Sequence, residues 1–271
     1  MSRNFELLQK LGKEQEVLNS VSAAADAPRP IPVPGPAHSQ TAVGAAPAIA
    51  PISAPLVAAA RLSKPGLEQI NGLAQQVFLS EGANAPRVVV FATTEPGSGC
   101  TWVCGHLAEV LASRVAGAVC VIDANLGTPG LHQLFDVENT VGISDALIHP
   151  DPIRGFVRQL SLANLWLISA GSCREAAQPL LTSDRMRLRI AELRSEFDFV
   201  LIDTPATSGS NDALGLGALS DGVVMVLKAN ASRRQTARQA VQEMQGANAK
   251  VLGAVLNQRT FPIPEAIYKR F

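Results

Sequence analysis

The stretch RVVVFATTEPGSGCT, residues 87–101, decides the fold of this chain. Its first half is a continuous apolar run typical of a buried strand, and its second half is a glycine-rich turn that leads into helical spacing over residues 102–114. Gly97 and Gly99 allow backbone amides to face an anion, and the start of the following helix adds its positive end. Strand, turn and helix together predict a phosphate-binding loop. A glycine-rich turn without a ligand is the alternative.

Short apolar runs alternate with longer amphipathic stretches over the rest of the chain. Apolar runs that are each followed by a helix indicate a parallel sheet covered on both faces. We therefore expect an α/β fold, a doubly wound and mostly parallel sheet of the P-loop NTPase type. The expected strands are residues 87–92, 118–123, 165–169, 199–203, 222–228 and 251–256, and the expected helices are residues 67–79, 102–114, 183–195, 208–219 and 233–247.

The sequence divides the chain into four segments. Residues 1–21 show apolar side chains near helical spacing, which predicts a short amphipathic helix that cannot bury its stripe alone. Residues 22–63 are rich in alanine and proline, as in an extended, disordered linker. Residues 64–260 hold the expected domain, and residues 261–271 a tail. Because we recognise neither a signal peptide nor a run of roughly 20 apolar residues, we expect no direct membrane insertion.

Charge and cysteine content narrow the classes of function. Lysine plus arginine equals aspartate plus glutamate at 23 each, so nothing in the net charge favours binding to nucleic acid. The four cysteines form no CxxC pair, which is typical of reduced thiols. We therefore expect a cytoplasmic protein.

Two aspartates end apolar strands. Asp123 ends the run VCVID at 119–123, and Asp203 ends the run VLID at 200–203. The carboxyl ends of parallel strands are the edge at which open α/β sheets bind ligands, and a carboxylate there can hold Mg²⁺ or its water shell. Capping of the next turn is the alternative for each aspartate. Their order and spacing after the glycine-rich turn favour a nucleotide site.

Three segments resemble one family specifically. They are EPGSGCT at 95–101, DANLGTPGLHQLF at 123–135 with GISDAL at 142–147, and DTP at 203–205 with NDAL at 211–214. Together they resemble the cytoplasmic domain of the bacterial tyrosine kinases of exopolysaccharide synthesis, within the wider MinD/ParA group of P-loop proteins. Glu95 stands where partitioning ATPases of that group carry their signature lysine, which favours the kinase branch.

The resemblance implies roles for particular residues. ATP and Mg²⁺ are the implied cofactors. Thr101, Asp123 and Asp203 would serve the metal, and the two aspartates would also serve the attacking group. Asn257 matches a position that contacts adenine, with a strand-ending polar residue as the alternative. The implied nucleotide-binding residues are Glu95, Pro96, Gly97, Ser98, Gly99, Cys100, Thr101, Trp102 and Asn257.

The resemblance also implies partners. The expected partner is the cytoplasmic tail of an inner-membrane regulator of polysaccharide chain length, which would recruit the protein to that membrane. Residues 1–21 on their linker suit such recruitment. The family also forms a homo-oligomer, but Asn71 and Ala74 stand near positions where it carries spaced arginines.

The departures from the family pattern fall on functional residues and not on the scaffold. Cys100 replaces the phosphate-binding lysine, Asn125 replaces an aspartate, and Gly127 replaces an arginine. The family's C-terminal tyrosine cluster is absent, and the chain has a single tyrosine, Tyr268. Phosphoryl transfer depends on charge stabilisation, so loss of the lysine removes on the order of a few kcal/mol. A thiol at the start of a helix would also have a lowered pKa, and a redox role for Cys100 is a minor hypothesis.

Three functions compete. The leading one is a degenerate kinase-like protein that acts as a nucleotide-binding regulator or scaffold of exopolysaccharide biosynthesis or export. The second is an active tyrosine autokinase that uses a substitute cation, for which Lys228, Arg233 and Arg234 are candidates. The third is a MinD/ParA-like positioning ATPase, which Glu95 and the absence of a basic amphipathic C-terminal helix disfavour.

Overall fold

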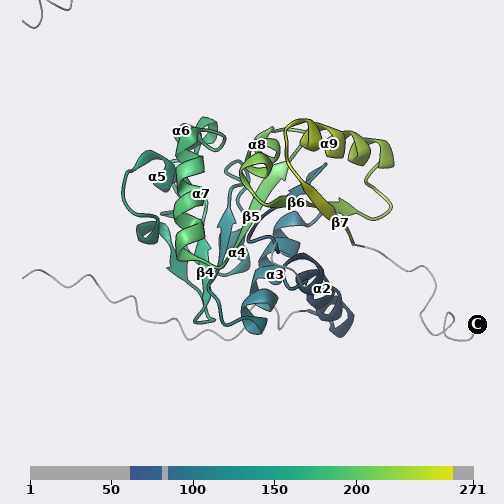
Figure 1. Ribbon diagram of the computed structural model, residues 1–271, viewed down its shortest axis with the longest axis horizontal. Helices are drawn as coiled ribbons and strands as arrows, with labels where there is room; N and C mark the ends of the chain where they lie inside the picture. Colours follow the sequence, from purple (N-terminus) through teal and green to yellow (C-terminus); the bar gives the residue numbers. More distant parts are fainter. Residues whose placement is uncertain (1–61, 81–84, 259–271) are drawn as a thin grey trace, which may run out of the picture. The chain divides into compact units, whose positions relative to one another are not determined.

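The computed structural model describes residues 62–80 and 85–258 of the chain. The helix expected over residues 1–21, nearly all of the linker and the tail lie outside these ranges. Within them, seven strands form one sheet, of which Figure 1 labels β4 to β7. The strand order is β3-β4-β2-β5-β1-β6-β7, and only the β3–β4 pair is antiparallel. The strands are β1 (Val88–Thr93), β2 (Val119–Asp123), β3 (Arg158–Gln159), β4 (Leu165–Ile168), β5 (Phe199–Ala206), β6 (Gly222–Lys228) and β7 (Val251–Asn257).

Helices cover both faces of the sheet. They are α2 (Lys64–Val77), α3 (Cys100–Arg114), α4 (Leu131–Leu134), α5 (Ile143–Ile148), α6 (Arg174–Ala177), α7 (Asp184–Glu196), α8 (Asp212–Leu219) and α9 (Arg234–Gly246), with the 3-10 turns η2 (Ile153–Phe156) and η3 (Gln178–Leu180). The described helices include none that is long and apolar enough to cross a bilayer.

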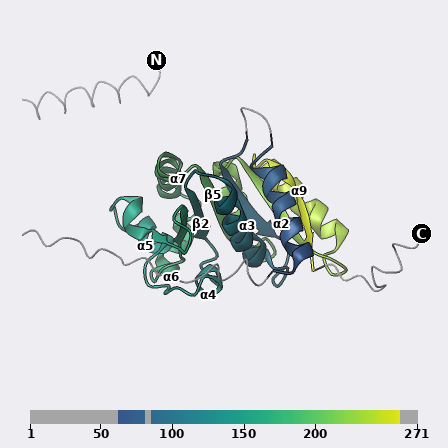
Figure 2. The same cartoon turned by 90° about the horizontal axis from the view of Figure 1, so that it is seen from below.

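Alternate side chains of the strands enter two separate cores. In β1, Val88 and Val90 belong to one core, whereas Val89 and Phe91 belong to the other. Helices α5, α7, α8 and α9 pack over the first core, and α2 and α3 over the second, where they stand in front of the sheet in Figure 2. This arrangement confirms the doubly wound α/β fold, because period-2 side chains of a parallel sheet need cover on both faces.

The structure moves several predicted boundaries. Strand β5 continues to Ala206 instead of ending at Asp203, and α3 begins at Cys100 instead of residue 102. Helix α2 begins at Lys64, three residues early, because Ser63 Oγ accepts a hydrogen bond from the Gly66 amide at 3.3 Å. The sequence missed β3 and the short helices α4, α5 and α6, since segments of two to six residues show no period.

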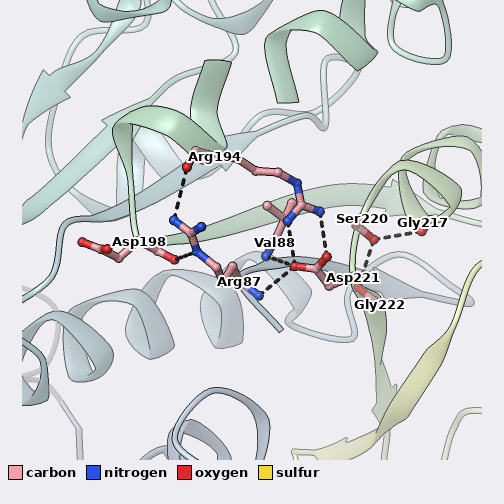
Figure 3. A network of polar contacts seen from close by, with 8 residues as sticks. All are labelled: Arg87, Val88, Arg194, Asp198, Gly217, Ser220, Asp221 and Gly222. Atoms are coloured by element: carbon pink, nitrogen blue, oxygen red, sulfur yellow. Dashed lines mark hydrogen bonds and ion pairs between the residues drawn. The ribbon is translucent and has the colours of Figure 1, made fainter. Parts of the chain in front are cut away.

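A polar network at the beginning of β1 joins three elements (Figure 3). Asp221 Oδ2 accepts hydrogen bonds from the backbone amides of Arg87 and Val88, each at 2.8 Å. Arg194 of α7 donates to both oxygens of Asp221, at 3.0 and 2.7 Å. The Arg87 guanidinium donates to the carbonyl oxygens of Arg194, Phe197 and Asp198. The network therefore fixes the end of α7 against β1 and β6.

We predict that Asp221→Ala lowers the free energy of unfolding by roughly 2–4 kcal/mol, because two backbone amides and a guanidinium lose their acceptor. The check is urea unfolding at pH 7. Asp184→Ala is the matched control, since its side chain is 94% exposed beside Arg187 and such a pair contributes less than about 1 kcal/mol. Equal losses in the two variants would contradict a structural role for the network.

Candidate nucleotide-binding site

The loop between β1 and α3 has the backbone of an anion-binding turn. Gly97 and Gly99 have φ angles of 76° and 82°, in the left-handed region that glycine adopts without steric cost. Ser98 Oγ donates a hydrogen bond to Thr93 Oγ1 at 2.6 Å, which ties the loop to the end of β1. The loop opens directly into the first turn of α3 at Cys100. The sequence prediction of this strand, turn and helix is confirmed.

Residues at the end of the last strand hold the loop from its other side. Asn257 Nδ2 donates to the carbonyl oxygen of Ser98 at 2.9 Å, and Gln258 Nε2 donates to that of Gly97 at 3.2 Å. A side chain at Gly99 would collide with the Asn257 amide. The Asn257 amide nitrogen is thus engaged by the loop backbone, and its contact with adenine stays a prediction.

The sheet register places the two aspartates side by side. Asp123 of β2 pairs with Asp203 of β5, and both side chains are buried. Asp123 accepts three backbone hydrogen bonds: from Gly130 and Leu131, each at 2.9 Å, and from Asn125 at 3.2 Å. It therefore fixes the start of α4, which is the capping role that the sequence left as an alternative.

Asp203 keeps one oxygen available. Thr101 Oγ1 donates to Asp203 Oδ2 at 2.6 Å, whereas Asp203 Oδ1 is buried and has no hydrogen-bond partner. An unsatisfied buried acceptor of this kind is uncommon and calls for a ligand or an ion. Mg²⁺ is commonly bound by one or two carboxylates together with phosphate oxygens and water. Asp203 and Thr101 offer such oxygen donors, so this pair fits Mg²⁺.

Burial and mutual repulsion favour protonation of the aspartates. Burial and then the charge of Asp123 raise the pKa of Asp203 to about 7, against the hydrogen bond from the Thr101 hydroxyl, which lowers it. Burial also raises the pKa of Asp123, although its backbone hydrogen bonds oppose the shift. A bound cation would oppose both shifts and favour the ionised carboxylates.

The Cys100 thiol does not have the lowered pKa expected of a helix start. The side chain is 7% exposed, and burial together with the nearby Asp203 carboxylate raises its pKa well above the usual value. Burial disfavours the charged thiolate, and the neighbouring carboxylate disfavours it further. The hypothesis of a lowered pKa is wrong, and the thiol is a poor candidate for a reactive nucleophile.

A cavity of about 1210 Å³ opens beside the loop. Of the residues predicted to bind nucleotide, those from Pro96 to Trp102 line it, whereas Glu95 and Asn257 do not. Asp123 and Asp203 lie beneath the lining and not in it. The described lining includes no lysine or arginine, so the candidate cations Lys228, Arg233 and Arg234 are not part of it.

The far wall of the cavity was not predicted. It comprises Gln178, Pro179 and Thr182 with residues 204–206 and 208–212. Gln178 Nε2 donates to Asp212 Oδ2 at 2.6 Å, which links η3 to the start of α8. The segment NDAL at 211–214 belongs to the sequence pattern shared with the family, but its residue types alone suggest no role.

The sheet, the glycine loop and the paired aspartates define the α/β fold of the P-loop NTPase class. Structures of the same fold include the kinase domain of the Escherichia coli tyrosine kinase ETK, with a TM-score of 0.70 and 23% identity over 78% of this chain and 83% of that chain. The septum site-determining protein MinD of Pyrococcus horikoshii, complexed with Mg-ADP, has a TM-score of 0.55 and 20% identity over 68% of this chain and 76% of that chain.

Sequence relatives narrow the class to a family. No family model matches the chain. The tyrosine-protein kinase YwqD of Bacillus subtilis (strain 168) is 30% identical over 169 residues, which are 62% of this chain and 71% of YwqD. The putative tyrosine-protein kinase CapB of Staphylococcus aureus is 25% identical over 191 residues, 70% of this chain and 83% of CapB. The chain belongs to the bacterial tyrosine-protein kinase family.

We predict that Asp203→Asn changes the pH dependence of stability. Between about pH 4 and pH 7 the folded chain retains a proton on Asp203 that the unfolded chain releases, so the unfolding free energy falls as the pH rises. Above pH 7 the buried charge costs at most about 4 kcal/mol. The neutral variant should therefore melt at a higher temperature than the natural protein above pH 7, and the difference should shrink toward pH 4.

Thermal melts across this pH range, without metal or nucleotide, provide the check. Asp136→Asn is the control, because Asp136 is exposed and asparagine accepts its positive φ equally well. If natural protein and Asp203→Asn kept a constant difference from about pH 4 to pH 8, the assignment of the proton to Asp203 would be wrong.

Proposed function

We propose that this chain is a regulator or scaffold of exopolysaccharide (capsule) biosynthesis or export that binds Mg·ATP or Mg·ADP weakly and transfers phosphate poorly. The observation that carries the proposal is Cys100, a neutral thiol at the position of the phosphate-binding lysine, in a cavity whose described lining has no lysine or arginine. Transfer of a phosphoryl group depends on stabilising its developing charge. A site without that charge can bind a nucleotide and still turn it over slowly.

Several features support retention of binding. The left-handed glycines, the Thr101–Asp203 hydrogen bond and the unpaired Asp203 oxygen would together provide contacts to phosphate and metal that do not depend on the lysine. In this proposal the loop from Pro96 to Trp102 cradles the phosphates, and Thr101 and Asp203 hold Mg²⁺, with Asp123 behind them. When bound, Mg²⁺ would neutralise phosphate charge and the two carboxylates.

The structures of two fold neighbours are complexes with the same class of ligand. MinD of Pyrococcus horikoshii was solved with Mg-ADP, and a variant of the McdA protein of Cyanothece with ATP. Both are below 25% identical to this chain, so they support the fold of the site and not its occupancy.

We predict that Cys100→Lys tightens Mg·ATP binding by about 10- to 100-fold, because a lysine would add a charge-assisted contact to phosphate. Isothermal titration of the natural protein, Cys100→Lys and Asp203→Ala provides the measurement, and Asp203→Ala should weaken binding. Cys100→Ser is the matched control, since it keeps the size and neutrality of the side chain. A tight natural site that Cys100→Lys leaves unchanged would contradict the proposal.

An active tyrosine autokinase is the alternative, and the same preparations distinguish it. Incubation with Mg·ATP followed by detection of phosphotyrosine would show transfer, for which the tail offers Tyr268 as the one tyrosine of the chain. Robust phosphorylation that Tyr268→Phe abolishes would favour the kinase over the scaffold.

The proposed partner is the cytoplasmic tail of an inner-membrane regulator of polysaccharide chain length. We predict that removal of residues 1–21 releases the protein from the membrane fraction of cells that contain this regulator, because a short helix on a linker is suited to docking. Fractionation and quantification of the protein give the measurement, with Asp136→Asn in the full chain as control. Unchanged membrane recovery after the deletion would show that recruitment does not use residues 1–21.

A further inference from the structure

An arginine of the described chain lies beside the cavity that the glycine loop lines. A second cavity of about 830 Å³ adjoins the nucleotide cavity, because Gly127 and Gln178 line both. Arg174 is the only lysine or arginine among the described residues that line this second cavity. A cation therefore lies next to the nucleotide cavity, whose described lining includes no lysine or arginine.

Gly127 leaves the space between the two cavities open. A Cβ atom built at Gly127 would meet no heavy atom within 4 Å. A glycine adds no side chain of its own to this space, so nothing at position 127 separates the two cavities. Arg174, the first residue of α6, lines the second cavity together with Gly127.

The segment that carries Arg174 is held at both of its ends. Before it, the amide and the hydroxyl of Ser172 donate to the Asp145 carboxylate at 3.1 and 2.9 Å. After it, Gln178 donates to Asp212 at 2.6 Å. Arg174 itself is exposed and forms no ion pair with the rest of the described chain. The backbone is thus positioned while the guanidinium stays available.

We propose that Arg174 binds the terminal phosphate of Mg·ATP across Gly127 and supplies the charge that Cys100 does not. This proposal rests on the nucleotide binding proposed above and names the residue that recognises the third phosphate. A guanidinium binds phosphate through two parallel hydrogen bonds, which suits a residue that must act from outside the loop. Lys228, Arg233 and Arg234 line neither cavity.

The test compares ATP with ADP, each with Mg²⁺, by isothermal titration of the full chain. We expect Arg174→Gln to weaken ATP binding by about 10-fold and to change ADP binding by less than about twofold, since ADP lacks the phosphate in question. Arg187→Gln is the control, because Arg187 is an exposed arginine on the neighbouring α7 that pairs with Asp184. We expect Gly127→Arg in the Arg174→Gln protein to recover ATP binding.

The outcomes separate this proposal from the proposed function. Loss of ATP affinity alone, with recovery in the double variant, supports Arg174. Equal loss of ATP and ADP affinity would mean that Arg174 only maintains its loop, and the proposal would be overturned. Unchanged ATP binding in Arg174→Gln would overturn it while nucleotide binding stands. If the natural protein bound neither nucleotide, the proposed function would fail and this proposal with it.

Discussion

The pairing of β2 with β5 determines the chemistry of the site. Because Asp123 and Asp203 occupy one register position, two carboxylates end side by side in a buried layer beneath the glycine loop. Neighbouring buried carboxylates oppose each other's ionisation. The apolar cores stabilise the sheet, and the sheet holds the two carboxylates side by side despite this repulsion. The charge of the site is therefore set by the fold and not by local hydrogen bonds alone.

The two aspartates differ in their hydrogen-bond partners and therefore in their roles. Three backbone amides surround the Asp123 carboxylate, so this side chain chiefly fixes the start of α4. Asp203 receives the Thr101 hydroxyl on one oxygen and leaves the other unpaired. Asp123 and Asp203 thus lie in adjacent strands, but only Asp203 has an oxygen without a hydrogen-bond partner that could accept a metal or its water.

The sequence predicted the sheet well because its strands are continuous apolar runs. The sequence also predicted the loop and both aspartates, since a glycine-rich turn and carboxylates at strand ends have well-defined physical roles in open α/β sheets. It did not predict the far wall of the cavity, because Gln178 and Asp212 meet only through tertiary packing. The predicted lowering of the Cys100 pKa is wrong for a related reason: the helix start is visible in sequence, but burial and a neighbouring carboxylate are not.

The glycine loop keeps its shape through contacts that need no ligand. Ser98 is tied to Thr93, and the amides of Asn257 and Gln258 hold the carbonyl oxygens of Ser98 and Gly97. None of these contacts involves the position of the missing lysine, so its replacement by Cys100 leaves the loop backbone supported. Electrostatic catalysis is more exacting than shape, because it needs charge where charge develops in the transition state. The architecture of the loop therefore does not depend on the charge that phosphoryl transfer requires.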